Sequence, residues 1–272
     1  MRLISSIKEL QNIEINVLRE FVGFCSQNKL EYFAMYGTLL GAVRDGDIIP
    51  WDDDIDICMP RKDYERFIEL TKKNGINEYV KIYNPIDNIS GEDIDVATIV
   101  RAYDNRTIIT SGDFTGIGVY IDIHPLDLFP DSKWVKQLWF IWIKLHNKGM
   151  RLAMVKMRSI SVTRFLLKMT LLPIILIAKL FGFRYFKKMI LKSAAYFSHR
   201  YPYSRECGSI LATWPIGQMS IDKKEFYEIK YKKFNSITIR VPGNYEKLLT
   251  SWYGDYRIPK EERWHNIVAF WL

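Results

Sequence analysis

The sequence predicts an α+β fold, with a mixed sheet, flanking helices and a basic, apolar helical insertion. Short runs rich in β-branched residues, such as VYIDIHPLD at 119–127, are typical of strands. Apolar residues at helical spacing precede and follow these runs. Strand character then disappears between about 132 and 204, where the residues are helical, apolar and basic. These observations predict a core of sheet and helices that is interrupted by an insertion of helices.

The composition fits one domain, or one domain with a subdomain, in a chain of 272 residues. A hydrophobic fraction of 48% is enough for a sizeable core and argues against a disordered chain. Lysine and arginine number 39 against 31 acidic residues, so the formal net charge is +8. That charge suits anionic partners such as phosphates, nucleic acid or an acidic membrane surface, although a soluble basic protein would show it too.

The cysteines and the N-terminal residues indicate the cell compartment. Cys25, Cys58 and Cys207 are isolated in apolar surroundings, and their odd number and spacing argue against a disulfide framework or a zinc site. We expect free, buried thiols in a reducing cytosol. Acidic residues at helical spacing in the first 20 residues argue against a signal peptide.

The first 130 residues are expected to alternate helices and strands. A helix is expected over 3–28, where Leu10, Val17 and Phe21 fall on one face. The elements expected after it are a strand over 31–37, a helix starting within 38–44, a strand over 54–59, a helix over 61–75 stopped by Gly75, and strands over 79–84, 96–104 and 118–127.

The rest of the chain divides into a helical part and a second α+β part. Helices are expected over 134–158 and 162–190, strands over 207–214 and 234–241, and a helix over 242–254 with proline near its start and glycine at its end. We therefore predict that residues 1–130 and 205–272 form one core, and that residues 131–204 are the helical insertion.

Four aspartates lie close together in PWDDDIDICMP, residues 50–60. Such carboxylates repel one another, and burying a charge costs several kcal/mol unless it is paired or bound to a metal. Side chains alternate along a strand, so Asp54 and Asp56 should share one face while Ile55 and Ile57 pack into the core. Asp52 has the same parity and Asp53 does not. One face of this strand is therefore expected to present acids.

A divalent cation would explain this acidic face. Mg²⁺ is commonly held by one or two carboxylates together with substrate phosphates, so Asp52, Asp54 and Asp56 are candidate ligands for Mg²⁺ or Mn²⁺. The alternative is a solvated acidic turn or a calcium-like surface loop, but the isoleucines argue against a loop.

Asp122 lies in a similar setting, between Ile121 and Ile123. If its strand is next to the first, Asp122 adds a third carboxylate, which could bind the metal or accept a proton from an attacking hydroxyl. His124 is close enough to Asp122 to be a further site candidate. Asp127 is expected to cap a turn, with a site role as the weaker alternative.

A candidate phosphate site precedes the acids in MYGTLLGAVRDG, residues 35–46. Gly37 and Thr38 lie between a strand end and a helix start, where free amides and a hydroxyl suit a phosphate. Arg44, about two turns further along, could also reach a phosphate. Arg101 is a second basic candidate on a predicted strand, with a structural or surface arginine as the alternative.

These motifs resemble a known family. YGTLLGAVRDGDIIPWDDDIDI, residues 36–57, closely resembles the signature of the LicD family, which are phosphotransferases of the nucleotidyltransferase-fold superfamily related to fukutin and fukutin-related protein. VYIDIHPLD and the segment VPGNYEKLLTSWYGDYRIPKEERWH, residues 241–265, are also similar. The resemblance covers most of the core, is weak over 132–204, and implies a nucleotidyltransferase-like mixed sheet.

The resemblance implies a Mg²⁺-dependent transfer of a substituted phosphate, such as phosphocholine or a polyol phosphate. The donor would be a CDP-linked alcohol, and the acceptor a sugar hydroxyl of a cell-surface glycan or of its lipid-linked precursor. By position, Asp54 and Asp56 would be the metal-binding pair, with Asp52 as a helper. Gly37 and Thr38 would face the donor phosphates, and Asp122 would be the third acid.

The chain departs from many relatives in carrying Asp45-Gly46-Asp47 after Arg44, where a basic or small residue often follows the arginine. This departure affects the expected contacts to the donor.

Residues 165–183 have two interpretations. Their longest uncharged run, Met169 to Ala178, is too short to cross a bilayer. A basic, apolar helix of this kind can lie in the interface of an anionic membrane, or it can be one of a buried helix pair. The lipid-linked or surface-glycan acceptors of the family favour the membrane, and hence a cytoplasmic protein that is peripheral at the inner face.

Two other functions fit parts of the sequence. A nucleotidyltransferase that releases pyrophosphate would share the same core. A basic RNA-binding module would show basic patches interleaved with exposed aromatic residues, whereas the basic residues here cluster around an apolar insertion. We therefore expect no nucleic-acid partner.

Overall fold

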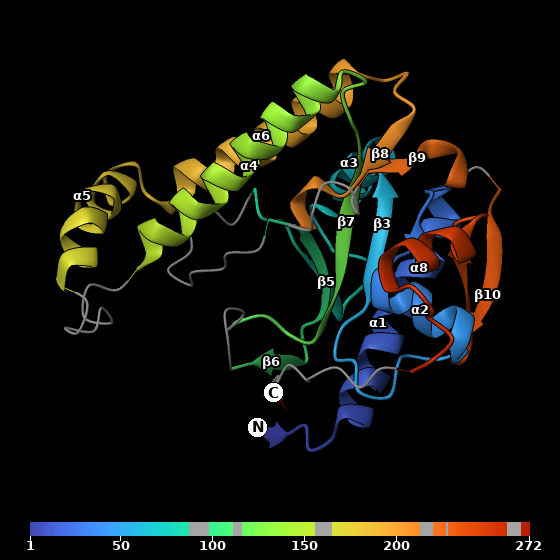
Figure 1. Ribbon diagram of the computed structural model, residues 1–272. Coiled ribbons are helices and arrows are strands. Elements are labelled where there is room, and N and C mark those ends of the chain that lie inside the picture. The colour runs from blue at the N-terminus through green and yellow to red at the C-terminus, as the bar shows by residue number, and fades with distance from the viewer. Residues whose placement is uncertain (87–97, 111–115, 156–164, 213–219, 227, 260–267) are drawn as a thin grey trace.

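The structure is a computed structural model that describes residues 1–86, 98–110, 116–155, 165–212, 220–226, 228–259 and 268–272 (Figure 1). The predicted strand residues 96–97 and 213–214, and residues 260–265 of the segment that resembles the family, lie outside these ranges.

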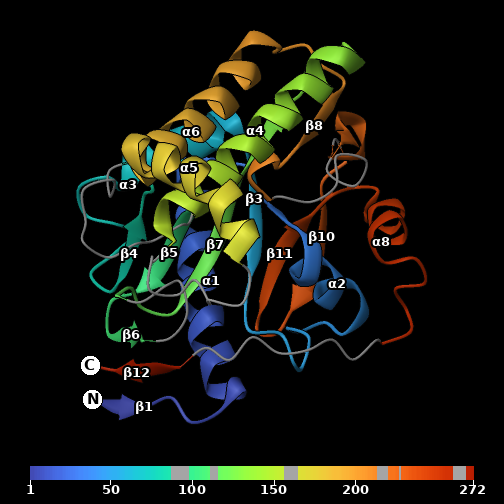
Figure 2. The ribbon, with the colours of Figure 1, turned by 60° about the vertical axis from the view of Figure 1, so that its left-hand side comes forward.

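A mixed sheet at the centre of the molecule confirms the predicted α+β class (Figures 1 and 2). Its strand order is β2-β3-β7-β5-β4, and β8 and β9 continue from the far end of β7. Only β3 and β7 pair in parallel among the described strands of this sheet. The strands are β2 (Phe33–Ala34), β3 (Asp56–Pro60), β4 (Val80–Tyr83), β5 (Val100–Asp104), β7 (Tyr120–Leu128), β8 (Glu206–Gly208) and β9 (Ile221–Asp222).

Four helices lie against this sheet and its neighbours: α1 (Ile7–Asn28), α2 (Tyr36–Arg44), α3 (Arg61–Thr71) and α8 (Tyr245–Tyr253). Helix α1 begins after Ser6, whose hydroxyl accepts a hydrogen bond from the Glu9 amide, and it ends at Lys29 in the left-handed conformation. The ring of Phe21 on α1 meets that of Phe67 on α3 edge to face, with centroids 5.3 Å apart. The main hydrophobic core therefore joins the helices to the buried face of the sheet.

Two smaller sheets complete the α+β part. Strands β1 (Arg2–Leu3), β12 (Ala269–Trp271) and β6 (Thr107–Ile109) form one of them, so the two ends of the chain lie side by side (Figure 2). Strands β10 (Lys230–Phe234) and β11 (Ile237–Val241) form a hairpin that turns at Asn235, where φ is 54°. Short 3₁₀ helices occupy η5 (Ile210–Ala212) and η6 (Lys223–Phe226).

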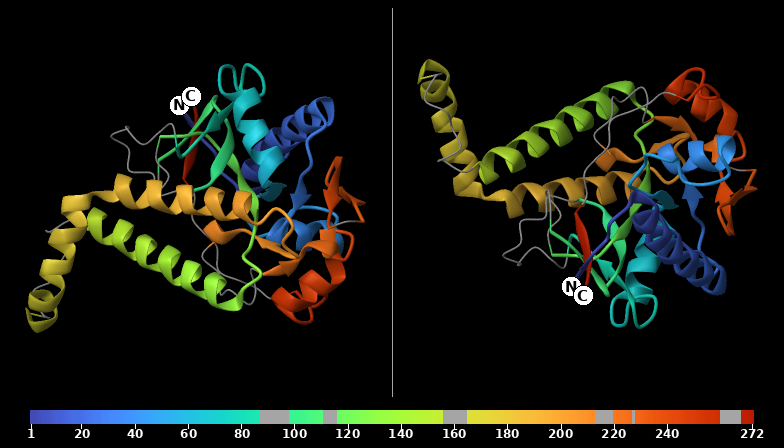
Figure 3. Two further views of the ribbon diagram at one scale, coloured as in Figure 1. Left: turned by 90° about the horizontal axis from the view of Figure 1, so that it is seen from above. Right: turned by 90° about the horizontal axis from the view of Figure 1, so that it is seen from below.

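Three helices form an arm that projects from the sheet (Figures 1 and 3). Helices α4 (Lys133–Met154) and α6 (Phe183–Arg200) run antiparallel, and α5 (Phe165–Phe181) lies at their far end. Gly149 on α4 lets the ring of Phe186 lie against the helix, because a Cβ atom there would overlap the ring. Within the described part of the chain, no helix is both long and apolar enough to cross a membrane.

The structure differs from the sequence-based expectations at several boundaries. Strand β3 begins at Asp56, so Asp54 precedes the strand, and β2 is short because helix α2 already starts at Tyr36. The expected helix over 162–190 is two helices, because Gly182 has φ of 76° and ends α5. Strands β6 and β10 were missed, since one is very short and the other is too rich in lysine to show an apolar pattern.

Candidate active site

A row of charged residues crosses three neighbouring strands. The parallel pairing of β3 with β7 sets Asp56 opposite Asp122, and the antiparallel pairing of β7 with β5 sets Asp122 opposite Arg101. Residues at the same register point to the same face of a sheet. The sheet therefore brings together two of the predicted acids and one of the predicted basic residues.

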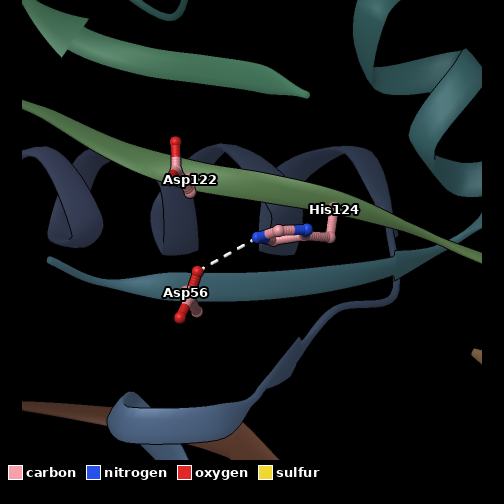
Figure 4. A group of neighbouring side chains, drawn as sticks. All are labelled: Asp56, Asp122 and His124. Atoms are coloured by element: carbon pink, nitrogen blue, oxygen red, sulfur yellow. Dashed lines mark hydrogen bonds and ion pairs between the residues drawn. The ribbon is translucent and has the colours of Figure 1, made fainter. Parts of the chain in front are cut away.

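His124 joins this row from two positions further along β7 (Figure 4). Its Nε2 lies 3.0 Å from Oδ1 of Asp56, and its Nδ1 lies 3.2 Å from the hydroxyl oxygen of Ser209. Burial lowers the pKa of His124, but the hydrogen bond and the charge of Asp56 outweigh it, so the pKa is raised. One ligand atom from each of Asp56, Asp122 and His124 lies within 4.8 Å of the others, a spacing that could hold a metal ion.

Arg101 holds Asp122 in place. Its Nε donates to Oδ1 of Asp122 at 2.7 Å, its guanidinium carbon lies 4.2 Å from the centroid of the Tyr120 ring, and its side chain is only 3% exposed. Burial raises the pKa of Asp122, although Arg101 and His124 act in the opposite direction. Arg101 therefore binds an acid of the cluster directly, and its contact with a phosphate stays a prediction.

Asp52 and Asp54 form a second pair of acids just before β3. Burial raises the pKa of Asp52 to about 6, and a hydrogen bond from Asp54 opposes that rise. Burial also raises the pKa of Asp54 well above its usual value, and the charges of Asp56 and Asp52 add to the effect. Carboxylates that share a buried space favour a proton or a cation between them. The side chains of this pair are thus arranged to take up positive charge.

The first turn of α2 is in direct contact with these acids. A Cβ atom on Gly37 would lie 2.6 Å from Oδ2 of Asp52, so any other residue there would force that carboxylate to move. The hydroxyl oxygen of Thr38 accepts a hydrogen bond from the amide of Asp56 at 2.8 Å. Tyr36, just before them, has φ of 47°, a conformation that is strained for an aromatic residue. Both predicted phosphate-site residues therefore position acids, and their contact with a phosphate is not tested.

Helix α1 contributes two polar residues that the sequence analysis missed. The side-chain amide of Gln11 donates to the carbonyl oxygens of Ile49 and Asp52 at 3.1 and 2.9 Å. Glu14 is 1% exposed, and among the described residues its Oε2 has no hydrogen-bond partner. Burial, followed by the charge of Asp53, raises its pKa well above the usual value. The available signal was two polar residues on the apolar face of the predicted helix.

Two other predicted residues pair outside the acid cluster. Arg44 donates from Nε and from a terminal nitrogen to Asp45 at 2.9 and 2.7 Å, so the acidic residue that departs from the family pattern holds it. Asp127 lies within β7, which makes the turn-cap prediction wrong, and accepts a hydrogen bond from Nε of Arg61 on α3 at 2.7 Å. Its parity differs from that of Asp122, so it belongs to the opposite face.

A mixed sheet with acids paired across adjacent parallel strands, and a helix start that contacts them, is the arrangement that the resemblance to a nucleotidyltransferase-fold enzyme implies. A family model described as LicD/FKTN/FKRP, nucleotidyltransferase domain, matches residues 29–147. These residues contain β3, β7 and the whole row from Asp56 to Arg101. The resemblance that the motifs indicated is confirmed over these residues, which match the nucleotidyltransferase domain of the LicD family.

Two known proteins are similar to the chain. Lipopolysaccharide cholinephosphotransferase LicD of Haemophilus influenzae is 29% identical over 263 residues, which is 94% of each protein. An uncharacterized protein of Rickettsia typhi is 39% identical over 67 residues, 25% of this chain and 22% of that protein. Because the first similarity extends over nearly the whole length, the predicted enzyme class, a LicD-type phosphotransferase, is confirmed.

Proposed function

We propose that the chain transfers a substituted phosphate, such as phosphocholine or a polyol phosphate, from a CDP-linked alcohol to a sugar hydroxyl. The acceptor would be a cell-surface glycan, such as lipopolysaccharide, or its lipid-linked precursor. The similarity to the Haemophilus influenzae cholinephosphotransferase supports the transferred group and the acceptor. The observation that carries the proposal is the pairing of Asp56 with Asp122 across β3 and β7.

Mg²⁺ or Mn²⁺ is the proposed cofactor, and the residues present fit it. Asp56 and Asp122 would hold the ion, with Asp54 and Asp52 beside them, since hard divalent cations prefer several oxygen ligands. The raised pKa values of Asp52, Asp54 and Asp122 support this role, because a cation would relieve the burial and repulsion that raise them. A bound cation would neutralise the donor diphosphate and so stabilise the leaving nucleotide.

The chain's own residues orient the reacting groups. Phosphoryl transfer depends mainly on position and charge. The first turn of α2, with Gly37 and Thr38, would meet the donor phosphates through its amides. Arg101 orients Asp122, which we propose as the acceptor of the hydroxyl proton. His124 donates to Asp56 and so keeps that carboxylate turned toward the cluster.

Phosphorus nuclear magnetic resonance on a reaction with Mg²⁺, a CDP-alcohol and a glycan acceptor tests the proposal. We expect a phosphodiester and CMP as products. The Asp122→Asn variant should lose turnover while the control Asp222→Asn, at an exposed carboxylate on β9, keeps it. Pyrophosphate together with a nucleotide-linked product would instead establish the competing function, nucleotidyl transfer.

The proposed acceptor also determines the place of action. A lipid-linked glycan precursor is confined to a membrane surface, so we propose that the enzyme is cytoplasmic and peripheral at the inner face of a membrane. In this proposal residues 1–130 and 205–272 supply the reaction, and residues 131–204 supply contact with the surface.

A further inference from the structure

The charge of the chain is divided between the arm and the core. Residues 132–205 contain sixteen lysines and arginines and no aspartate or glutamate. The other 198 residues contain 23 lysines and arginines and all 31 acidic residues. The net charge of +8 is therefore the sum of a strongly cationic arm and an anionic core. An overall charge alone would not show this separation.

Helix α4 exposes an apolar stripe along its length. Trp134 is 82% exposed, Leu138 is 65% exposed and Leu145 is 59% exposed. Ile141 and Trp142 lie between them, at 46% and 39%. Spacings of three and four residues place all five side chains on one face of the helix. This face is a large apolar surface that no described part of the chain covers.

The buried face of α4 lies on the opposite side of the helix. Trp139, Ile143 and Met150 are buried there, in the cluster that joins α4 to α6 and to Phe129 at the end of the sheet. The helix therefore packs into the fold by one face, and its exposed stripe is a second apolar face. A helix that only needed to pack would be polar on that second side.

Exposed basic residues flank the stripe. Lys144, Lys148 and Arg151 are exposed on α4 at one side of it. Helix α5 lies at the far end of the arm (Figure 3). It exposes a further apolar group. The exposed members of that group are Ile174, Leu176, Ile177, Leu180 and Phe181.

We propose that the arm binds an anionic bilayer surface, with the α4 stripe among the lipid headgroups and the flanking basic residues on lipid phosphates. Tryptophan favours that interface, and lysine and arginine gain from anionic lipid. The arm of a second copy is a poor occupant, because it would bring two acid-free, cationic arms together. The proposal rests on the proposed function only for its purpose, which is to reach a lipid-linked acceptor.

This surface is connected directly to the acid cluster. Strand β7 carries Asp122 and ends at Leu128, and α4 begins at Lys133. Phe129, between them, is buried in the core that the arm shares with the sheet. A bound arm would therefore hold the candidate active site at a fixed position relative to the bilayer.

Flotation with vesicles tests the proposal, using phosphatidylglycerol mixed into phosphatidylcholine and phosphatidylcholine alone. We expect binding to the anionic vesicles that weakens with salt, and little binding to the neutral ones. In Leu138→Gln/Leu145→Gln, the loss of two inserted leucines should weaken binding by on the order of tenfold or more. The control is Leu70→Gln, at a 44% exposed position on α3, which should bind as the parent does.

A charge-reversal pair tests the electrostatic part. Lys148→Glu/Arg151→Glu should weaken binding strongly at low salt, whereas Lys72→Glu/Lys73→Glu, with the same change of charge beyond α3, should weaken it less. Unchanged binding in both arm variants, equal loss in the controls, or a dimer that the stripe variant dissociates would overturn the proposal. Flotation needs neither donor nor metal, so this result is independent of the transferase assay.

Discussion

The acid cluster and the arm depart from ordinary burial in opposite ways. Around β3 and β7 the fold holds carboxylates largely out of water, whereas along α4 it exposes tryptophan and leucine. Both arrangements cost stability in an isolated protein, because the first removes charge from water and the second leaves apolar surface in it. Each region therefore indicates the kind of partner that would stabilise it. The acids need positive charge, and the apolar stripe of the arm needs an apolar phase.

The largest expected effect concerns the acids. Asp56→Asn keeps the shape of the side chain and an acceptor for His124 but removes its negative charge. We expect initial rates to fall on the order of 1,000-fold, the scale of losing one preorganised electrostatic group. Nucleotide release measures the rate, and circular dichroism checks the fold. An active Asp56→Asn variant, or an equally inactive Asp255→Asn at an exposed position, would remove Asp56 from the site.

The next effect tests how closely the acids are packed. In Gly37→Ala the new methyl group would meet Oδ2 of Asp52, so the carboxylate must move and we expect about tenfold or greater loss of activity. Gly23→Ala on α1 is the matched control, since a Cβ atom there has no neighbour within 4 Å. It should keep activity and gain about 0.5–1 kcal/mol of stability from its helix propensity. Equal activity in the two variants would contradict the packing argument.

The acid cluster, unlike the arm, should make the thermal stability of the protein depend on pH. The pKa of Asp52 is raised to about 6 in the fold from a usual value near 4, so its protonated form favours the folded state. Stability from this group is fully present below pH ~4 and is lost as the pH rises through about 6. With EDTA, the melting temperature should therefore fall between pH 5 and pH 7.5, by about 3 °C or more. Mg²⁺ should restore it at pH 7.5, and a melting temperature that ignores Mg²⁺ would argue against a cation among these acids.

A smaller effect is expected at Glu14, behind the cluster. Its buried Oε2 has no hydrogen-bond partner among the described residues, and burial raises its pKa. Glu14→Gln removes the acid at nearly constant volume, so we expect the metal-free protein to gain about 1 kcal/mol at pH 7. Denaturant titration measures the change. A loss of stability would show that the carboxyl group itself makes a favourable interaction there.

The smallest effect is expected in the arm. Leu145→Gln changes an exposed side chain, so the free energy of unfolding should stay within about 0.5 kcal/mol of the parent in the absence of lipid. Ile143→Ala, two residues away on the buried face of α4, should cost about 2–5 kcal/mol. Similar losses in both variants would mean that the stripe packs against protein.

Local chemistry explains what the sequence could predict. The alternation of acids and isoleucines on two strands indicated Asp56 and Asp122 as site residues, because that pattern needs only neighbours along the chain. The pairing of Asp56 with Asp122, and the approach of Arg101, depend on sheet register and appeared only in the structure. Local reasoning also extended the strand too far, to Asp54.

Residues that act across the fold were harder to predict. Gln11 and Glu14 lie in a helix whose pattern is that of a core element. Gln11 donates hydrogen bonds to a loop about 40 residues later, and the charge of Asp53 in that loop acts on Glu14. The stripe on α4 was hidden for a similar reason. A helix with two apolar faces has the composition of a buried helix, so only the exposure of each side chain in the folded structure separates the two faces.

The pairing of β1 with β12 has a consequence for how the chain is made. Trp271 donates from its indole nitrogen to Glu9, a contact between residues 262 positions apart. A ribosome that adds 5–20 residues per second would release the second partner roughly 10–50 s after the first. During vectorial synthesis the start of α1 therefore emerges long before the strand that closes over it. The small sheet at the two ends is among the last parts that can form, so premature termination would leave both β1 and β6 with unpaired edges.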